Sequence, residues 1–290
     1  MIRTYFGLER NPFSSESVTL LPHQQDVFDI LGVHGQQGGL CLLMGDPGTG
    51  KSAIKDAVRQ RADKRQLVVT VGRTLHTYMN TLKILCQAFA VDAAGTAFKC
   101  ERALLAEAHK LNGQGKSLAI IIDDAHLMDV QSLRRLRLLL DDFPKSHNLI
   151  LAGHADMLNF LTLRVNEDIR SRVTYSTILP KLTDDGVVAF VGEQLEKAGL
   201  GGNILDADAL SLIGRQSEGV LRRARNLCLA TLLEAVRRGR KQVGIEVVNA
   251  VLRQPHWRLH SDLDYEMPKR LEPLEKPKLE NKVSKDPVGV

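Results

Sequence analysis

Residues 45–52 read Gly-Asp-Pro-Gly-Thr-Gly-Lys-Ser and match the phosphate-binding pattern G-x-x-x-x-G-K-[ST] at every fixed position. The glycines lack Cβ atoms, so the backbone can curl and direct its N–H groups at phosphate oxygens. A lysine at position 51 would reach the β- and γ-phosphates, and the hydroxyl of Ser52 would be a ligand of Mg²⁺. We therefore predict that a phosphate ligand is bound by Gly45, Asp46, Pro47, Gly48, Thr49, Gly50, Lys51, Ser52 and Ala53.

The segments on either side of this loop favour the same interpretation. An apolar segment over 40–44 precedes the loop, and a helical pattern over 53–58 follows it. The N-terminus of that helix would add its dipole to the anion site. The alternative, a glycine-rich turn that matches by chance, does not explain why strand, loop and helix occur in this order.

Two carboxylates end a second apolar segment. The run over 118–122 is typical of a buried parallel strand and is followed by Asp123 and Asp124. Open α/β sheets bind ligands at the carboxyl ends of their strands. We predict that Asp123 holds Mg²⁺, usually through water, and that Asp124 orients or deprotonates an attacking water. The alternative is a strand that ends in a solvated acidic turn. The two motifs together predict binding and hydrolysis of ATP with Mg²⁺.

The elements that must position these residues alternate between strands and helices. Strands are predicted over 40–44, 66–71, 118–122, 148–153 and 173–178, and helices over 53–58, 77–90, 99–111 and 130–141. This alternation predicts an α/β fold in which helices cover both faces of a parallel sheet, as in P-loop NTPases. From Thr183, an expected N-cap, only helical patterns follow, ending near 198 and then covering 206–216, 219–238 and 244–253.

Three regions follow from these patterns. We predict an α/β nucleotide-binding domain over 1–180, a small α-helical lid domain over 181–254 and a tail over 255–290. Prolines lie among lysines and glutamates in the tail, without apolar periodicity. The tail is therefore expected to be disordered or to fold only on a partner.

Composition narrows the classes of function. The formal charge of +5 and the pI of about 9.0 permit contact with nucleic acid without requiring it. Aromatic residues make up 4% of the chain, which argues against stacking platforms for single strands. The four cysteines lack metal-ligand spacing and are expected to be buried, reduced thiols, as in cytosolic proteins. No secretory leader and no run of about 18 apolar residues is visible, so we expect a cytoplasmic protein without an integral membrane segment.

The order of these motifs resembles that of AAA+ ATPases over residues 4–253. More narrowly, the chain resembles the ExeA/GspA-type branch, which includes helper ATPases of Mu- and Tn7-like transposition (TniB/TnsC-like). The resemblance also rests on Tyr5-Phe6-Gly7-Leu8, Asn11-Pro12-Phe13, Ile122-Asp123-Asp124-Ala125-His126, Leu151-Ala152-Gly153-His154, Asp168-Ile169-Arg170-Ser171-Arg172 and Ser217-Glu218-Gly219-Val220-Leu221-Arg222.

The resemblance implies roles for further residues. His154 stands where such proteins place a polar sensor of the γ-phosphate, often Asn or Gln; a hydrogen-bonded structural histidine is the alternative. Arg172, or Arg170, stands where an arginine finger enters the site of a neighbouring subunit, the alternative being a solvated pair. Arg222 corresponds to the lid arginine that contacts the nucleotide in cis, and its neighbours Arg223 and Arg225 are expected at the surface.

The N-terminal residues have two interpretations as well. Tyr5, Phe6, Pro12 and Phe13 are expected either near the adenine or at an edge of the core, and Gln24 and Gln25 are candidates to contact the base.

Three basic clusters leave open whether the chain binds DNA. They are Arg134/Arg135/Arg137, Arg222/Arg223/Arg225 and Arg237/Arg238/Arg240/Lys241. Each alone is typical of a solvated helix face. The leading hypothesis is an ATPase that forms a homo-oligomer with ATP, binds double-stranded DNA without sequence preference and recruits a transposase-type partner. The alternatives are an accessory ATPase of a secretion or pilus assembly system, whose relatives usually carry a membrane segment and a periplasmic domain, and a non-enzymatic nucleotide-dependent scaffold.

Overall fold

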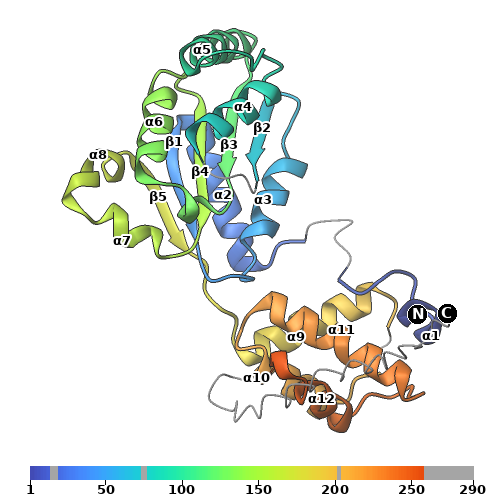
Figure 1. Cartoon of the computed structure of the whole chain (residues 1–290). Helices are drawn as coiled ribbons and strands as arrows, with labels where there is room; N and C mark the ends of the chain where they lie inside the picture. Colours follow the sequence, from blue (N-terminus) through green and yellow to red (C-terminus); the bar gives the residue numbers. More distant parts are fainter. Residues whose placement is uncertain (14–18, 73–76, 201–203, 258–290) are drawn as a thin grey trace, which may run out of the picture. The chain divides into compact units, whose positions relative to one another are not determined.

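The sheet of the protein consists of five parallel strands. A computed structural model describes residues 1–13, 19–72, 77–200 and 204–257. Its strands are β1 (Gly39–Met44), β2 (Gln66–Val71), β3 (Ser117–Ile122), β4 (His147–Gly153) and β5 (Val173–Ile178), in the order β2-β3-β4-β1-β5 (Figure 1). All neighbouring strands pair in parallel, which confirms the predicted fold class.

Burial along the strands explains why most of them can be recognised as apolar runs in the sequence. β1, β3 and β4 are buried at every position after the first, so they are continuous apolar runs rather than alternating ones. β5 lies at the edge of the sheet, where half-buried and exposed residues alternate. The strand boundaries therefore lie within one residue of those predicted from the apolar runs.

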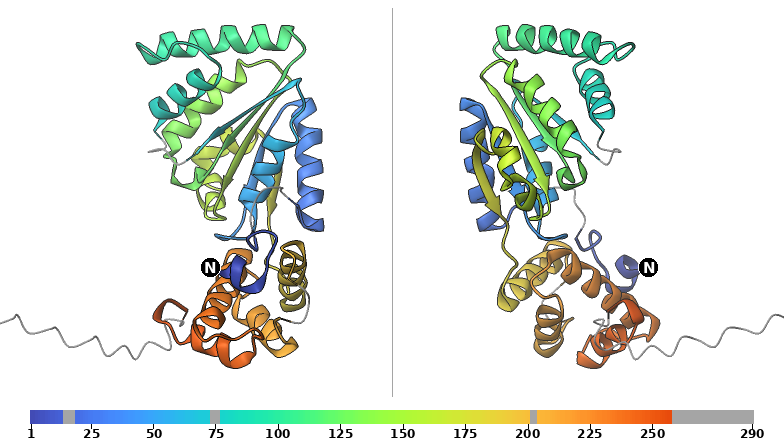
Figure 2. Two further views of the ribbon diagram at one scale, coloured as in Figure 1. Left: turned by 90° about the vertical axis from the view of Figure 1, so that its right-hand side faces the viewer. Right: turned by 60° about the vertical axis from the view of Figure 1, so that its left-hand side comes forward.

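Helices cover both faces of the sheet (Figures 1 and 2). On one face α4 (Tyr78–Ala88), α5 (Ala97–Gly113) and α6 (Val130–Asp141) pack in the same core cluster as Leu42 and Met44 of β1. On the other face α2 (Pro22–Gln37) and α3 (Lys51–Gln60) pack with Cys41 and Leu43. Alternate residues of β1 thus enter opposite cores, as the period of a strand requires.

The cysteines belong to these cores. Cys41, Cys86, Cys100 and Cys228 are all buried and none forms a disulfide. Burial raises the pKa of Cys41 and of Cys86 to about 11, so both are protonated thiols at neutral pH. The expectation of buried, reduced thiols is confirmed.

Polar caps begin several helices. The side chains of Thr77, Thr96 and Asp129 accept hydrogen bonds from the first turns of α4, α5 and α6. Thr183 does the same for α9 (Asp184–Lys197) and accepts from the Gly186 N–H at 3.1 Å, as its sequence context predicts.

Beyond β5 the regular elements of the described residues are helices. They are α9, α10 (Ala207–Gln216), α11 (Leu221–Arg237) and α12 (Ile245–Leu252), together with one isolated bridge between Leu205 and Val243. The domain limits at 180 and 254 remain predictions. Pro255–Trp257 form a short 3-10 helix, and residues 258–290, most of the tail that we expect to be disordered, lie outside the described residues.

The sequence patterns miss the long helix α2, and several short helices escape them as well. The short helices are α1 (Ile2–Phe6), α7 (Met157–Leu161) and α8 (Glu167–Arg170), with 3-10 turns at Ala125–Leu127 and Arg164–Asn166. One or two turns are too short to reveal a period of 3.6 residues. In the part of the chain that the structure describes, no helix has the length and apolar character needed to cross a membrane.

Candidate functional site

The register of the sheet brings three loops to one edge. Met44 of β1 pairs with Gly153 of β4, and Ile122 of β3 pairs with Leu151 of β4. The phosphate-binding motif follows Met44, the paired carboxylates follow Ile122, and His154 follows Gly153. Residues that are distant in the chain therefore leave the sheet side by side, at the carboxyl ends of parallel strands.

Glycine is required at two points of the 45–52 loop. Gly48 has φ 90°, and an added Cβ would lie 2.7 Å from the Cβ of Arg222 and 2.9 Å from Cγ1 of Val220. Gly50 has φ 110°, and an added Cβ would overlap the side-chain amide of Gln24. The positive φ values and the close neighbours both exclude side chains here. Helix α3 begins directly at Lys51, so the loop ends at a helix N-terminus.

Lys51 is held by the loop itself. Its Nζ donates hydrogen bonds to the carbonyl oxygens of Gly45 at 2.7 Å and Asp46 at 2.9 Å. Burial lowers the pKa of Lys51, while attraction to Asp123 and Asp124 opposes this shift. The ammonium group therefore lies within reach of the paired carboxylates, and Ser52 follows it as an exposed residue of the first helical turn.

Asp123 and Asp124 lie where β3 ends. The Asp123 N–H continues the ladder to the carbonyl oxygen of Val71 at 2.9 Å, and the Asp124 N–H donates to Oδ1 of Asp123 at 3.1 Å. Asp124 has φ 50°, a left-handed conformation that aspartate and asparagine tolerate better than most residues. Oδ2 of Asp123 accepts a hydrogen bond from Nζ of Lys55, one turn beyond the phosphate loop on α3.

His154 has several polar neighbours. Its Nδ1 lies 2.8 Å from Oδ2 of Asp156, and its Nε2 lies 3.7 Å from Oδ1 of Asp46. The other carboxylate oxygen of Asp46 lies 3.0 Å from Nζ of Lys181, and this hydrogen bond holds the pKa of Asp46 below its usual range. The backbone N–H of His154 donates to Nδ1 of His126 at 3.3 Å. His154 is thus both hydrogen-bonded and adjacent to the phosphate loop, so the geometry fits either interpretation.

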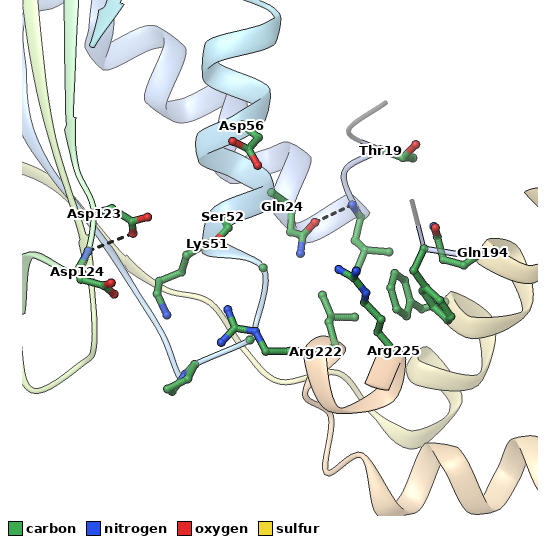
Figure 3. A pocket seen from close by; sticks show the side chains of 18 of the residues that line it. Thr19, Gln24, Lys51, Ser52, Asp56, Asp123, Asp124, Gln194, Arg222 and Arg225 are labelled. Carbon is green, nitrogen blue, oxygen red and sulfur yellow. Dashed lines mark hydrogen bonds between the residues drawn. The ribbon is translucent and has the colours of Figure 1, made fainter. Parts of the chain in front are cut away.

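The helical segment reaches the same loop through Arg222. Its backbone N–H donates to the carbonyl oxygen of Gly48 at 3.2 Å. In Figure 3, Lys51 lies between the paired carboxylates on one side and the guanidinium of Arg222 on the other. Arg225, one turn further along α11, also lines the cavity, whereas Arg223 pairs with Glu218 at 3.0 Å. Arg225 is exposed, as expected of a surface residue, and it also lines the cavity because one face of α11 is directed there.

These groups enclose one cavity of about 490 Å³, within the usual range for small-molecule sites. The predicted site residues that line it are Pro47, Gly48, Gly50, Lys51, Ser52, Ala53, Asp123, Asp124, His154 and Arg222. Gly45, Asp46 and Thr49 belong to the same loop and are not among its lining residues. The cavity therefore brings together both sequence motifs, His154 and Arg222.

Aromatic and amide side chains also line the cavity. Phe13 and Phe190 pack there with ring centroids 5.9 Å apart, beside Gln24 and Gln194. The side chain of Gln24 is buried, accepts from the Leu21 N–H at 3.1 Å and donates to the carbonyl oxygen of Thr49 at 3.4 Å. Gln24 therefore connects the start of α2 to the phosphate loop.

The other N-terminal candidates lie elsewhere. Tyr5 and Phe6 pack edge to face, 5.0 Å apart, with Lys241 over the Tyr5 ring, and neither lines the cavity. Pro12 is also absent from the lining, and Gln25 bonds Asp29 and Arg61 instead. Of this group, Phe13 and Gln24 therefore remain next to the candidate ligand site.

The two candidate finger arginines do not line the cavity. Arg170 lies 3.7 Å from Glu167, and Arg172 lies 3.8 Å from Asp141. Their side chains are 51% and 60% exposed, so both can reach beyond the chain. Both side chains therefore lie outside the cavity of their own chain, which is compatible with a role at a neighbouring subunit.

Three functional candidates escaped the sequence reasoning. His126 and Arg225 line the cavity, and Lys55 binds Asp123. His126 belongs to the Ile122–His126 motif, and Arg225 follows Arg222 by three residues on a helix, which is the spacing of one face. Lys55 carries no sequence signal toward Asp123, because 68 residues separate the two.

Ion pairs within the chain engage much of the three basic clusters. In the first, Arg134 pairs with Asp168, Arg135 with Glu101 and Arg137 with Asp141. In the third, Arg237 and Arg238 share Glu234, whose pKa they lower to about 2, and Arg240 lies 3.7 Å from Glu246. The third cluster keeps more unpaired positive charge than the first, although less than its sequence suggests.

The donor set of the cavity fits a hydrated Mg²⁺. Hydroxyl and carboxylate oxygens are the ligands that this cation prefers, with one or two carboxylates completed by phosphates and water. Ser52 and Asp123 both line the cavity, and Asp123 already binds a cationic group, the ammonium of Lys55. The oxygen donors expected for Mg²⁺ therefore face the same cavity.

Comparison with known proteins agrees with this architecture. Residues 33–161 match a family model described as an AAA domain. General secretion pathway protein A of Aeromonas hydrophila is 26% identical over 253 residues, which cover 84% of this chain and 46% of that protein. The chain thus spans about half the length of this relative.

Two solved structures share the fold. The Aeropyrum pernix ORC2 protein in its ADPNP–ADP complexes has a TM-score of 0.69 and 14% identity, covering 85% of this chain and 72% of that one. The Aeropyrum pernix ORC1 protein in complex with DNA has a TM-score of 0.65 and 20% identity, covering 82% of this chain and 66% of that one. At these identities the likeness shows the fold alone.

Proposed function

The chain is an AAA+ protein of the ExeA-like type, and from this premise we propose that it binds ATP with Mg²⁺ and hydrolyses the γ-phosphate. The observation that carries the proposal is the convergence of Lys51, Asp123, Asp124 and Arg222 on one cavity of about 490 Å³. In such a cavity, positioning and electrostatic stabilisation suffice for phosphoryl transfer to water.

Each residue has a distinct task in this proposal. Lys51 leaves the carbonyl oxygens of Gly45 and Asp46 and binds the β- and γ-phosphates. Ser52 and Asp123 would hold Mg²⁺, which would supply positive charge to stabilise the phosphates. Asp124 accepts a proton from the attacking water, and Arg222 contacts the nucleotide from the helical segment.

Titration of the purified protein with a fluorescent ATP analogue, followed by measurement of phosphate release, tests the proposal. Binding together with slow release supports an ATPase. Binding without any release, alone or in the assembled state, would favour the non-enzymatic scaffold. The absence of binding with Mg²⁺ present would overturn the assignment of the cavity.

We also propose that ATP drives self-association and that Arg172 completes the site of a neighbouring subunit. Arg172 is exposed and does not line its own cavity, so the proposal places its charge on a phosphate bound by another copy. Sedimentation velocity should show larger species with a non-hydrolysable ATP analogue than with ADP. We expect Arg172→Ala to lower turnover by about 10³-fold in the assembled state, the lower end for arginine fingers.

A mixing experiment separates action in trans from a structural effect. Arg172→Ala subunits keep an intact site, and Asp124→Asn subunits keep an intact finger. Mixing the two inactive variants should restore part of the activity, because one supplies the finger to the other. Arg164→Ala, an exposed residue of the same segment, is the control and should remain active. If the mixture stays inactive while both variants assemble, the finger lies elsewhere.

For the biological process we propose an ATP-dependent, DNA-binding regulator that recruits a transposase-type partner. The positive charge remaining in the cluster Arg237/Arg238/Arg240/Lys241 supports DNA binding, and the fold is shared with a protein whose structure contains DNA. The similarity to general secretion pathway protein A favours the second candidate, an accessory ATPase of a secretion or pilus assembly system.

Salt dependence of DNA binding distinguishes these two candidates. With the ATP analogue present, unrelated duplexes should bind with similar affinity, and the affinity should fall steeply with salt because counterions are released. Replacing Arg240 and Lys241 by glutamine should reduce the slope of log K against log salt by about 0.9 for each phosphate that the variant no longer neutralises. Fluorescence anisotropy measures both effects, with Lys99→Gln/Arg102→Gln on α5 as the control. Salt-insensitive binding, or none at low salt, would favour the secretion-type function.

A further inference from the structure

Lys55 binds the carboxylate that is predicted to hold the metal. Its Nζ donates to Oδ2 of Asp123, and the two side chains are 17% and 21% exposed. Oδ1 of the same carboxylate accepts the N–H of Asp124 at 3.1 Å. Both oxygens of Asp123 are therefore engaged by the protein, one of them by a full positive charge.

Lys55 and Lys51 lie differently with respect to the cavity. The two lysines are four residues apart on α3 and so share one face of the helix. Lys51 lines the cavity and is held by the phosphate loop, whereas Lys55 is not among the residues that line the cavity. Lys55 thus contacts Asp123 from the side of α3, behind the surface that a nucleotide would meet.

We propose that Lys55 is an internal counter-cation of Asp123 that competes electrostatically with Mg²⁺, so that nucleotide binding by this chain depends only weakly on the metal. This inference rests on the proposed nucleotide site. With Lys55 present, the charge of Asp123 is already offset, and phosphates can enter without metal. The same offset weakens the attraction between Asp123 and Mg²⁺, since a neighbouring cation opposes a second one.

Removal of the Lys55 charge should therefore weaken nucleotide binding in the absence of metal and strengthen the binding of Mg²⁺ when the metal is present. Without metal, Asp123 would carry an uncompensated negative charge toward the phosphates, and nucleotide affinity would fall. In the presence of Mg²⁺, the metal would replace the missing positive charge, and Asp123 would bind the metal more strongly than in the wild-type protein. A unit charge a few ångströms away in a partly buried site opposes a second cation enough to change its affinity by roughly 10-fold or more.

The test compares the dissociation constant of a fluorescent ADP analogue in EDTA with that in excess Mg²⁺. In the wild-type protein the two constants should be similar, within about fivefold. In Lys55→Met their ratio should increase by about 10-fold or more, and half-saturating Mg²⁺ at fixed nucleotide should fall by about 10-fold, because the repulsion between two cations is removed. Lys55→Arg keeps the charge and should behave as wild type, as should Lys83→Met, an exposed helical lysine of α4.

Two further variants address folding and specificity. Lys55→Gln keeps a hydrogen-bond donor without the charge and serves if Lys55→Met does not fold. In an Asp123→Asn background, Lys55→Met should change the ratio by less than about twofold, because the charge that Lys55 offsets is gone.

The alternative outcomes are distinct. An unchanged ratio in Lys55→Met and Lys55→Gln overturns the inference and leaves Lys55 as a structural link between α3 and β3. An equal loss of affinity with and without metal also overturns it, since Lys55 would then contact phosphate. If the wild-type protein binds no nucleotide in either condition, the proposed function fails instead.

Discussion

Lys51→Ala is expected to weaken nucleotide binding by at least about 10-fold, because it removes the cation that reaches the β- and γ-phosphates. A hydrogen bond to a charged group contributes about 1.5–3 kcal/mol, and a buried ammonium can make more than one such bond to phosphates. Lys51 is half buried between Asp123, Asp124 and Arg222, so solvent cannot replace it fully. Titration with a fluorescent ATP analogue measures the loss.

The control for this variant must separate binding from folding. Without nucleotide, Lys51 bonds the carbonyl oxygens of Gly45 and Asp46, so its removal could also loosen the loop. Thermal unfolding should show a melting temperature close to that of the wild type, and Lys83→Ala, on the surface of α4, should bind nucleotide normally. Normal binding by a folded Lys51→Ala variant would contradict the assignment of the phosphate site.

Asp124→Asn is expected to bind ATP within about threefold of the wild-type affinity and to hydrolyse it about 10²–10⁴-fold more slowly, the usual range for loss of a general base. The amide keeps the size of the side chain and cannot accept the proton of the attacking water. Asn also tolerates the left-handed backbone that Asp124 adopts at φ 50°, so the substitution changes chemistry without straining the turn. Phosphate release under single-turnover conditions isolates the chemical step.

The control for this variant is the same substitution at a carboxylate outside the cavity. Asp142→Asn, at the exposed end of α6, removes one negative charge away from the cavity and should leave turnover unchanged. If Asp124→Asn hydrolyses ATP at the wild-type rate in the assembled state, another group activates the water. His154 and His126, which also line the cavity, would then be the next residues to replace.

The fold could be predicted because its main signals are local. β1, β3 and β4 are buried on both faces, so each is a continuous apolar run that needs no partner to be recognised. Helices such as α6 carry their own cap, here Asp129, and a period of 3.6 residues. The short α7 and α8 have neither signal, because their positions depend on contacts with the rest of the chain.

The residues of the candidate site also fall into two groups: those that local sequence predicts and those that tertiary packing places. The phosphate loop is contiguous, so residue types and spacing define its shape, and Asp123 and Asp124 follow a recognisable strand. By contrast, the sequence makes Gln24 a candidate to contact the base, whereas the structure gives it hydrogen bonds to Leu21 and Thr49. Such a link depends on how α2 packs, which no spacing in the sequence encodes.

The phosphate loop, the paired carboxylates at a strand end and the α/β class could all be predicted from the residues alone, since each depends on neighbouring residues and on the period of one element. Which distant groups meet there depends on the folded chain, which brings Arg222 to Gly48, His154 to Asp46 and Lys55 to Asp123. The reason is physical. The parallel register of the sheet and the packing of helices on it place side chains from separate segments a few ångströms apart, and charges at that distance change one another's binding.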